Sequence, residues 1–232
     1  MSVYELLFGD QTIDDVMMDA SFPPGGALDA GRSRMWEGQP QEAANLVSGS
    51  IEPWASFIVA LARQAQGQSP VKQLRSVAEN GFLEARPRLW AWTALRKLGE
   101  QPAQVHAAEV LGVVAEVPID GGVDVLSAYA DGSVRYLNQA GALFARETSE
   151  GPSELVVAVL TEAFPLLSVP PAPRDPEAPP PEPKNVRITA LSARGIHRVD
   201  LPDSAIAKGG SHQKLFTALT RLLADTAQQK PA

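Results

Sequence analysis

The stretch Val110-Leu-Gly-Val-Val-Ala-Glu-Val117 decides the fold class, because the pattern of the chain changes there. Before Gln104, Ala-rich segments of about ten to fifteen residues alternate with Gly, Pro and Ser, which is typical of short helices. From Val110 to Arg146, β-branched residues and turn signals follow one another closely, which is typical of strands. The sequence therefore predicts an α+β fold, with an N-terminal bundle of helical hairpins followed by an antiparallel sheet.

The strand region reads as a meander that continues beyond a proline-rich linker. Asp131-Gly132 is a strong hairpin signal, because this dipeptide tolerates the positive φ angles of a tight turn. The hairpin and helix after the linker are too small to be stable alone, so we expect them to complete the same sheet. The predicted strands are 110–117, 123–130, 133–137, 142–146, 186–191 and 196–199, with covering helices at 153–167 and 211–227.

The first half carries helical periodicity. Trp54, Phe57 and Ile58 recur at three- and four-residue steps, so one face of their helix is expected to be buried. Trp90 and Trp92 point to different faces of a helix, so at most one of them is expected inside and the other would mark a contact surface. The predicted helices are 28–37, 40–48, 51–66, 69–80 and 84–98.

These patterns divide the chain into three parts. Residues 1–26 are expected to form an N-terminal arm, with an amphipathic stretch from Val3 to Phe8 that packs on another part of the molecule. Residues 27–104 form the helical domain. Residues 105–232 form the α+β domain, interrupted by an extended, solvated linker at 169–184 that contains eight prolines.

Parts of the chain resemble known families. The run Trp36-Glu-Gly-Gln-Pro-Gln-Glu-Ala-Ala44 resembles the turn between paired helices of a tetratricopeptide-like array, although a non-repetitive bundle is an equal alternative because no fixed repeat aligns. The sheet with its two covering helices resembles profilin-like or roadblock-like modules. The residues Ala128-Tyr-Ala-Asp-Gly132, Arg135-Tyr136, Asn138 and Gly141 resemble the core of a family of uncharacterised bacterial proteins, which brings no known activity.

Composition excludes several classes of function. The chain has no cysteine, which rules out disulfides and thiolate metal sites. Its net charge of -7 disfavours nucleic acid and favours a basic protein partner. No run of about 18 apolar residues predicts a membrane span, and the start of the chain lacks a basic leader, so we expect a cytoplasmic protein without membrane contact.

The search for chemistry finds no catalytic, cofactor or metal motif. The three histidines, His106, His197 and His212, are not spaced as a metal pair on one element. Gly209-Gly210 precedes a helix but fits a flexible joint and cap better than an anion site. The sequence does not decide whether the protein is an enzyme, and the lack of a catalytic motif favours a non-enzymatic role.

Four residues of the meander form the most distinctive cluster: Tyr129, Arg135, Tyr136 and Asn138. Tyr and Arg are favoured anchors of protein interfaces, so these residues and Trp90 are the candidate interaction residues. The alternative is an aromatic and cation pair that only stabilises the hairpin.

The leading hypothesis is an adaptor or scaffold that binds another protein. An immunity or chaperone-like protein that neutralises a basic partner, and a small-ligand sensor or enzyme with a pocket on the sheet, are the alternatives. Self-association into a homo-oligomer also stays open.

Overall fold

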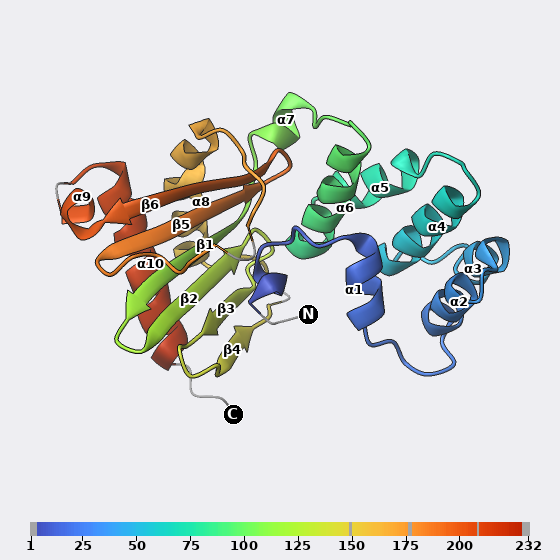
Figure 1. Ribbon diagram of the computed structural model, residues 1–232, viewed down its shortest axis with the longest axis horizontal. Coiled ribbons are helices and arrows are strands. Elements are labelled where there is room, and N and C mark those ends of the chain that lie inside the picture. The colour runs from blue at the N-terminus through green and yellow to red at the C-terminus, as the bar shows by residue number, and fades with distance from the viewer. Residues whose placement is uncertain (1–3, 149, 176–177, 208, 229–232) are drawn as a thin grey trace. The chain divides into compact units, whose positions relative to one another are not determined.

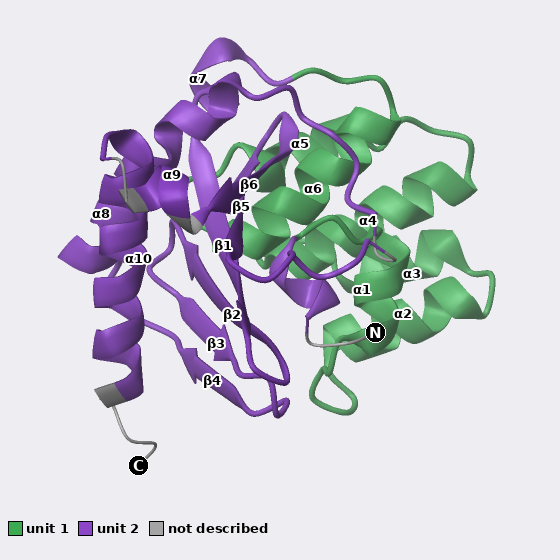
Figure 2. Cartoon of the chain, turned by 60° about the vertical axis from the view of Figure 1, so that its left-hand side comes forward, with its two compact units in different colours: residues 1, 9–101 green, residues 2–8, 102–232 purple. Residues whose placement is uncertain are grey.

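The computed structural model describes residues 4–148, 150–175, 178–207 and 209–228 (Figure 1). The chain divides into two compact units (Figure 2). Residues 9–101 form the helical unit, and the described parts of residues 2–8 and 102–232 form the sheet unit. The residues expected to form an arm are therefore shared: residues 9–26 belong with the helices and residues 4–8 with the sheet.

The helical unit is built from short helices whose ends match local signals. Pro40 and Pro53 stand at the first turns of their helices, where a missing N–H costs nothing. Gly38, Gly67 and Gly99 follow helix ends with positive φ angles, which a residue with a Cβ rarely adopts. The helices are α1 (Ile13–Asp19), α2 (Ala27–Trp36), α3 (Pro40–Leu46), α4 (Pro53–Ala65), α5 (Val71–Ala78) and α6 (Ala85–Lys97). The five predicted helices correspond to α2 through α6.

The core of the helical unit buries both tryptophans of α6. Trp92 is fully buried and Trp90 is nearly so, so the expectation that one of them lies outside is wrong. The reason is that α6 packs against α5 and also against α1, which the periodicity of α6 alone does not reveal. Phe57 and Ile58 of α4 are also fully buried, as their spacing predicts.

The sheet unit contains a six-stranded antiparallel sheet with the strand order β4-β3-β2-β1-β5-β6. The strands are β1 (Val110–Ile119), β2 (Gly122–Tyr129), β3 (Val134–Leu137), β4 (Leu143–Arg146), β5 (Asn185–Ser192) and β6 (Gly195–Pro202). The Asp131-Gly132 turn joins β2 to β3, and Gly132 has a φ of 92°. A Cβ there would lie 2.6 Å from the Gly151 carbonyl oxygen, so glycine is required both for the backbone angle and for the lack of space. The hairpin β5–β6 completes the sheet by pairing with β1, and the predicted α+β class is confirmed.

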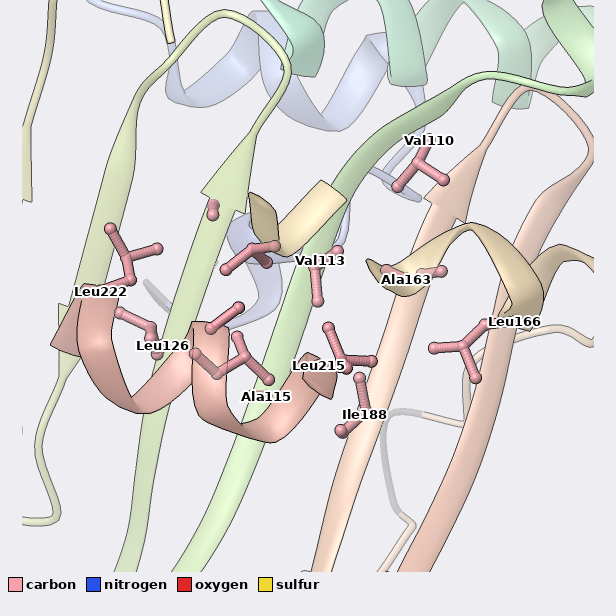
Figure 3. Close-up of a cluster of buried hydrophobic side chains, with 14 of the residues drawn as sticks. Val110, Val113, Ala115, Leu126, Ala163, Leu166, Ile188, Leu215 and Leu222 are labelled. Atoms are coloured by element: carbon pink, nitrogen blue, oxygen red, sulfur yellow. The ribbon is translucent and has the colours of Figure 1, made fainter. Parts of the chain in front are cut away.

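Two helices cover one face of the sheet, α8 (Glu154–Ala163) and α10 (Ser211–Gln228). Their apolar sides meet alternate residues of the strands, among them Val113, Leu126 and Ile188 (Figure 3). A 3-10 turn η2 (Phe164–Ser168) follows α8, and two further short helices, α7 (Gln104–Ala107) and α9 (Asp203–Ala207), complete the unit. Neither α7 nor α9 was expected, because four or five residues carry too little periodicity to be recognised.

The N-terminal residues form one 3-10 turn and one helix. Within the stretch from Val3 to Phe8, of which Val3 lies outside the described residues, only a 3-10 turn η1 (Glu5–Leu7) forms. The helix is α1 instead, and it begins at Thr12 with a capping box: the Asp15 N–H donates to Thr12 Oγ1 at 3.1 Å, and the Thr12 N–H donates back to the Asp15 carboxylate at 3.2 Å.

The proline-rich segment is extended but not simply solvated. The Ala172 N–H donates to the Ile196 carbonyl at 3.0 Å as an isolated bridge to β6. The Pro179 carbonyl accepts from Arg187 Nη1 at 2.9 Å, and Pro181 is buried. Its described residues therefore belong to the sheet unit. Among the described residues, no helix is both long and apolar enough to span a membrane.

Candidate functional site

The candidate site is a groove of the helical unit between α4 and α6. Residues 9–22, here called the N-terminal segment, lie in it, and α1 packs against both helices (Figure 1). The open part of the groove is lined by Ala60, Leu61 and Gln64 of α4, by Thr93, Ala94, Lys97 and Leu98 at α6, by Pro70 and Leu74, and by Thr12, Ile13 and Asp14 of the N-terminal segment itself. We refer to it as the α4–α6 groove.

The start of the N-terminal segment is fixed on α6. Thr93 Oγ1 donates to the Gly9 carbonyl at 3.3 Å, and Trp90 Nε1 donates to Gln11 Oε1 at 2.9 Å. Gly9 has a φ of 61°, and a Cβ at this position would lie 2.7 Å from Leu89 Cβ. Glycine is therefore needed both for the backbone angle and for the close approach to α6.

The end of α1 is held by Arg32 of α2. Its guanidinium donates through Nη1 to the Met17 carbonyl at 3.5 Å, and to the carbonyl of Ala20. A cation is stabilising at a helix C-terminus, where the last carbonyls lack partners within the helix. The same guanidinium lies 5.0 Å from the ring centre of Phe22 and 5.2 Å from that of Trp36. Arg32 therefore recognises the backbone of α1 and links it to two aromatic rings.

The side chains of α1 divide into two sides. Ile13, Val16 and Met17 are buried, whereas the next methionine, Met18, is 67% exposed. An aromatic row continues along the unit, with ring centres 5.5 Å apart for Phe22 and Trp54 and 5.7 Å apart for Trp54 and Trp90. The groove thus binds the apolar side of a short amphipathic helix.

The N-terminal segment leaves part of the groove empty. A cavity of about 210 Å³ remains beside the first turn of α1. Small-molecule sites usually hold about 300 to 1,000 Å³, so this cavity is smaller than most of them. Leu98, which is 46% exposed, lies at its edge.

The groove and the segment in it carry opposite charges. Arg96 and Lys97 occupy the last turn of α6, and α2 adds Arg32, whose guanidinium also pairs with Asp29 of the same helix at 3.1 Å. Burial lowers the pKa of Arg96, and the nearby Asp10 carboxylate opposes that shift. The N-terminal segment carries four acids, Asp10, Asp14, Asp15 and Asp19. Coulomb attraction therefore favours an acidic segment in this groove.

The sheet unit has a second polar cluster, on the face away from α8 and α10. The Tyr4 hydroxyl donates to Glu116 Oε1 at 2.8 Å, and Tyr129 donates to the Leu7 carbonyl at 2.7 Å. Arg187 lies 3.8 Å from Glu116 and binds both oxygens of Asp200 at 2.9 and 3.1 Å. These contacts fasten residues 4–8 to the sheet.

Burial sets the ionisation of this cluster. Burial raises the pKa of Glu116, while the Tyr4 hydrogen bond and the Arg187 charge oppose the rise. Burial and the Glu116 charge together raise the pKa of Tyr4. The adjacent cavity of about 30 Å³ is lined by Thr189, whose buried hydroxyl oxygen has no hydrogen-bond partner. This volume has room for one water molecule, not for a metabolite.

The structure separates the predicted interaction residues of the meander. Tyr129 and Arg135 are buried, with the Arg135 guanidinium 5.6 Å from the Tyr129 ring centre and paired with Glu147. Tyr136 points to the opposite face, because neighbouring residues of a strand alternate, and it donates to Asp124 at 2.6 Å. Burial and this Asp124 contact raise the pKa of Tyr136 to about 12.

Asn138 and Trp90 have roles that stabilise local structure. Asn138 Oδ1 accepts from the backbone N–H groups of Ala140 and Ala142, which closes the turn between β3 and β4. Trp90 is buried against Trp54 and Gln11 in the helical unit. The five predicted residues therefore do not share one exposed surface, and whether any of them contacts a partner stays a prediction.

The histidine of β6 is buried. His197 is fully buried, with Nδ1 2.6 Å from the Val169 carbonyl and Nε2 2.9 Å from the Ser192 hydroxyl. A buried pair of this kind is not accessible to a substrate. Across the part of the chain that the structure describes, no three His, Asp or Glu side chains are grouped to hold a metal ion.

Sequence reasoning missed Gly9, Gln11 and Arg32, which hold the N-terminal segment. The Thr12-x-x-Asp15 pattern was the available signal for α1, but nothing in a local pattern pairs Gln11 with Trp90, 79 residues away. The chain matches no protein-family model, no curated protein and no solved structure.

Proposed function

We propose that this is a non-enzymatic interaction protein whose helical unit binds a helical segment of a partner protein in the α4–α6 groove. One observation carries the proposal: the groove already holds a short amphipathic helix of the same chain, with its apolar side buried, its Met17 carbonyl bound by Arg32 and the Gly9 carbonyl before it bound by Thr93. This is the helix-in-groove mode of peptide recognition.

The residues around the groove have the chemistry of interface anchors. Trp and Arg dominate the binding energy of many protein interfaces. Trp36 is 56% exposed and stacks on Arg32, and the empty cavity beside α1 offers room for a partner side chain. The sheet unit acts as the scaffold in this proposal.

The ligand-sensor and enzyme alternatives have less support. The cavity on the sheet face has room for one water, and His197 is inaccessible. Tyr136, Arg135 and Asn138, the polar residues of the meander that such a pocket could use, do not converge on one cavity: Tyr136 bonds Asp124, Arg135 lies over Tyr129, and Asn138 closes a turn. The geometry therefore favours binding of a protein.

Photo-cross-linking in the native host tests the proposal. A photoreactive amino acid at position 98 stands at the edge of the cavity, and one at the fully exposed position 82 serves as the control. We expect one partner to cross-link from position 98 and not from 82. Leu98→Glu should abolish its co-purification, and Phe82→Glu, the matched apolar-to-acid change, should preserve it.

Two results would contradict the proposal. A partner that cross-links equally from both positions does not use the groove. A partner that co-purifies undiminished with Leu98→Glu binds elsewhere. Both variants change exposed side chains, so both should fold, which circular dichroism can verify.

A further inference from the structure

We infer that the N-terminal segment is a displaceable intramolecular ligand of the α4–α6 groove, and that the partner segment replacing it is an acidic amphipathic helix of the same pattern. The inference rests on the proposed function and goes beyond it by naming the chemistry of the partner and the device that regulates access. Four features of the helical unit support it.

The first feature is that the contacts are those of peptide recognition. Thr93 and Arg32 bind backbone carbonyls, at Gly9 and Met17, which every chain possesses. Three buried side chains, Ile13, Val16 and Met17, supply the sequence preference. A different chain with apolar residues at the same spacing, preceded by a glycine and an amide side chain at the places of Gly9 and Gln11, can therefore make the same contacts.

The second feature is that the present occupant is short. The α1 helix has seven residues, and isolated helices below about 12 residues are marginal in water. Its helical form depends on the groove, so leaving the groove and unfolding are one event. A longer partner segment that is already helical in solution loses less conformational entropy on binding.

The third feature is how the occupant is tethered. The chain between α1 and α2 contains Pro23, Pro24 and Gly25, which are exposed. Gly25 has a φ of 74°, and a Cβ added to it would meet no atom within 4 Å. This exposed connection does not itself pack against the groove, so α1 can move away without breaking packing there.

The fourth feature is charge. Arg32, Arg96 and Lys97 lie on the helices that line or cap the groove, and the N-terminal segment carries four aspartates. A partner helix with acids between its apolar residues matches this surface. The net charge of -7 predicts a basic partner for the chain as a whole, whereas the groove selects an acidic helix.

Tethering explains how such a ligand regulates binding. A segment joined to its own site acts at an effective concentration in the millimolar range for short flexible linkers. A helical segment of a partner protein must compete with the tethered N-terminal segment at this effective concentration. The intact protein therefore binds the partner segment weakly until α1 leaves the groove.

A labelled synthetic peptide of residues 9–22 tests the inference by fluorescence anisotropy on the full chain. Met17→Asp weakens the buried side of α1 inside the protein, and Met18→Asp is the matched control on its exposed side. We expect the Met17→Asp protein to bind the wild-type peptide at least about tenfold more tightly than the wild-type protein does. The Met18→Asp protein should bind it as the wild type does.

Changes in the peptide test recognition separately. A peptide with Met17→Asp should not bind the released protein, and one with Met18→Asp should bind. A peptide with all four aspartates changed to asparagine should bind several-fold more weakly at low salt. Equal affinity of the wild-type and Met17→Asp proteins, or binding that ignores these peptide changes, overturns the inference.

A measurement on the wild-type protein covers the case in which Met17→Asp fails to fold. Backbone amides of α1 should exchange hydrogen faster than those of α4 and α6, because the segment opens while the rest of the unit stays folded. Exchange of α1 at the rate of α4 would mean that it opens only with global unfolding, and would overturn the inference. If position 98 cross-links a partner but the peptide never binds, the inference fails and the proposed function stands.

Discussion

Residues 4–8 and residues 9–22 follow one another in the chain, but they belong to different units. Residues 4–8 cover a face of the sheet, and residues 9–22 cover a face of the helical unit. Residues 4–8 lie on the sheet, where Tyr4 makes a partly buried and Tyr129 a fully buried hydrogen bond, and the adjacent cavity measures only about 30 Å³. Residues 9–22 lie in the α4–α6 groove, beside an empty cavity of about 210 Å³. The first segment completes a closely packed face of the sheet, whereas the second leaves its face incompletely filled, which supports our proposal that it can be exchanged.

The two faces also use charge differently. Arg187, Glu116 and Asp200 form an ion network on the sheet, with Arg187 and Glu116 almost fully buried. Such a network is costly to break, because each buried ion depends on the others. The cations near the α4–α6 groove attract the acidic N-terminal segment, which we expect to leave the groove. Changes at the sheet face should therefore affect the free energy of unfolding most.

Arg187→Ala should have the largest effect. It leaves Glu116 with its buried charge uncompensated and removes the donor to the Pro179 carbonyl, so we expect a loss of about 4 kcal/mol in the free energy of unfolding. Urea denaturation followed by far-ultraviolet circular dichroism measures it. Arg221→Ala, on the exposed side of α10, is the control and should change stability by less than about 0.5 kcal/mol. A similarly small effect for Arg187→Ala would contradict the account of the network.

Gly9→Ala should lower the free energy of unfolding by about 2 kcal/mol, because the alanine has to adopt a left-handed backbone angle and its Cβ clashes with Leu89. Gly25→Ala is the control, because Gly25 also has a positive φ but has open space around it. We expect it to lower the free energy of unfolding by about 1 kcal/mol, the cost of the backbone angle alone. All four tryptophans, Trp36, Trp54, Trp90 and Trp92, lie in the helical unit. Tryptophan fluorescence during urea unfolding therefore reports this unit, and equal midpoints for the two variants would show that Gly9 does not pack closely on α6.

Glu116→Gln should change the pH dependence of stability. Since burial raises the pKa of Glu116, the folded protein favours the neutral carboxyl. Its stabilising contribution is fully present below the ordinary glutamate pKa of about 4.3 and is lost as pH rises through the raised value. Urea midpoints of the wild type should therefore fall relative to those of Glu116→Gln over this window. A constant difference between the two proteins would mean that Glu116 titrates normally.

Asp124→Asn should have the smallest effect, a local change of ionisation. The pKa of Tyr136 is raised to about 12 by burial and by Asp124, so folding stability is lost as pH rises from about 10 through that value. Removing the carboxylate should return the pKa part of the way toward 10, which carbon-13 NMR of labelled tyrosine measures. Tyr136 titrating at an unchanged pH in the variant would assign the shift to burial alone.

Much of the fold could be predicted from local patterns. Strand ends near Val110 and Arg146, the Asp131-Gly132 turn and the helices α2 through α6 follow from residue type and spacing over a few positions. The sequence also predicts that the β5–β6 hairpin joins the same sheet, because a hairpin and helix of that size cannot be stable alone, but it does not predict that β5 pairs with β1. The candidate site was not predictable in this way, since its residues come from separate helices.

The sequence by itself determined the α+β class and the order of the elements, because hydrophobic periodicity and turn chemistry act between near neighbours. Only the tertiary structure decided which faces are covered and by what. Tyr129 bonds to Leu7, and Trp90 bonds to Gln11, and these contacts bury residues that look like exposed anchors in the sequence. Such long-range contacts depend on how helices and strands pack in three dimensions, which no spacing along the chain encodes.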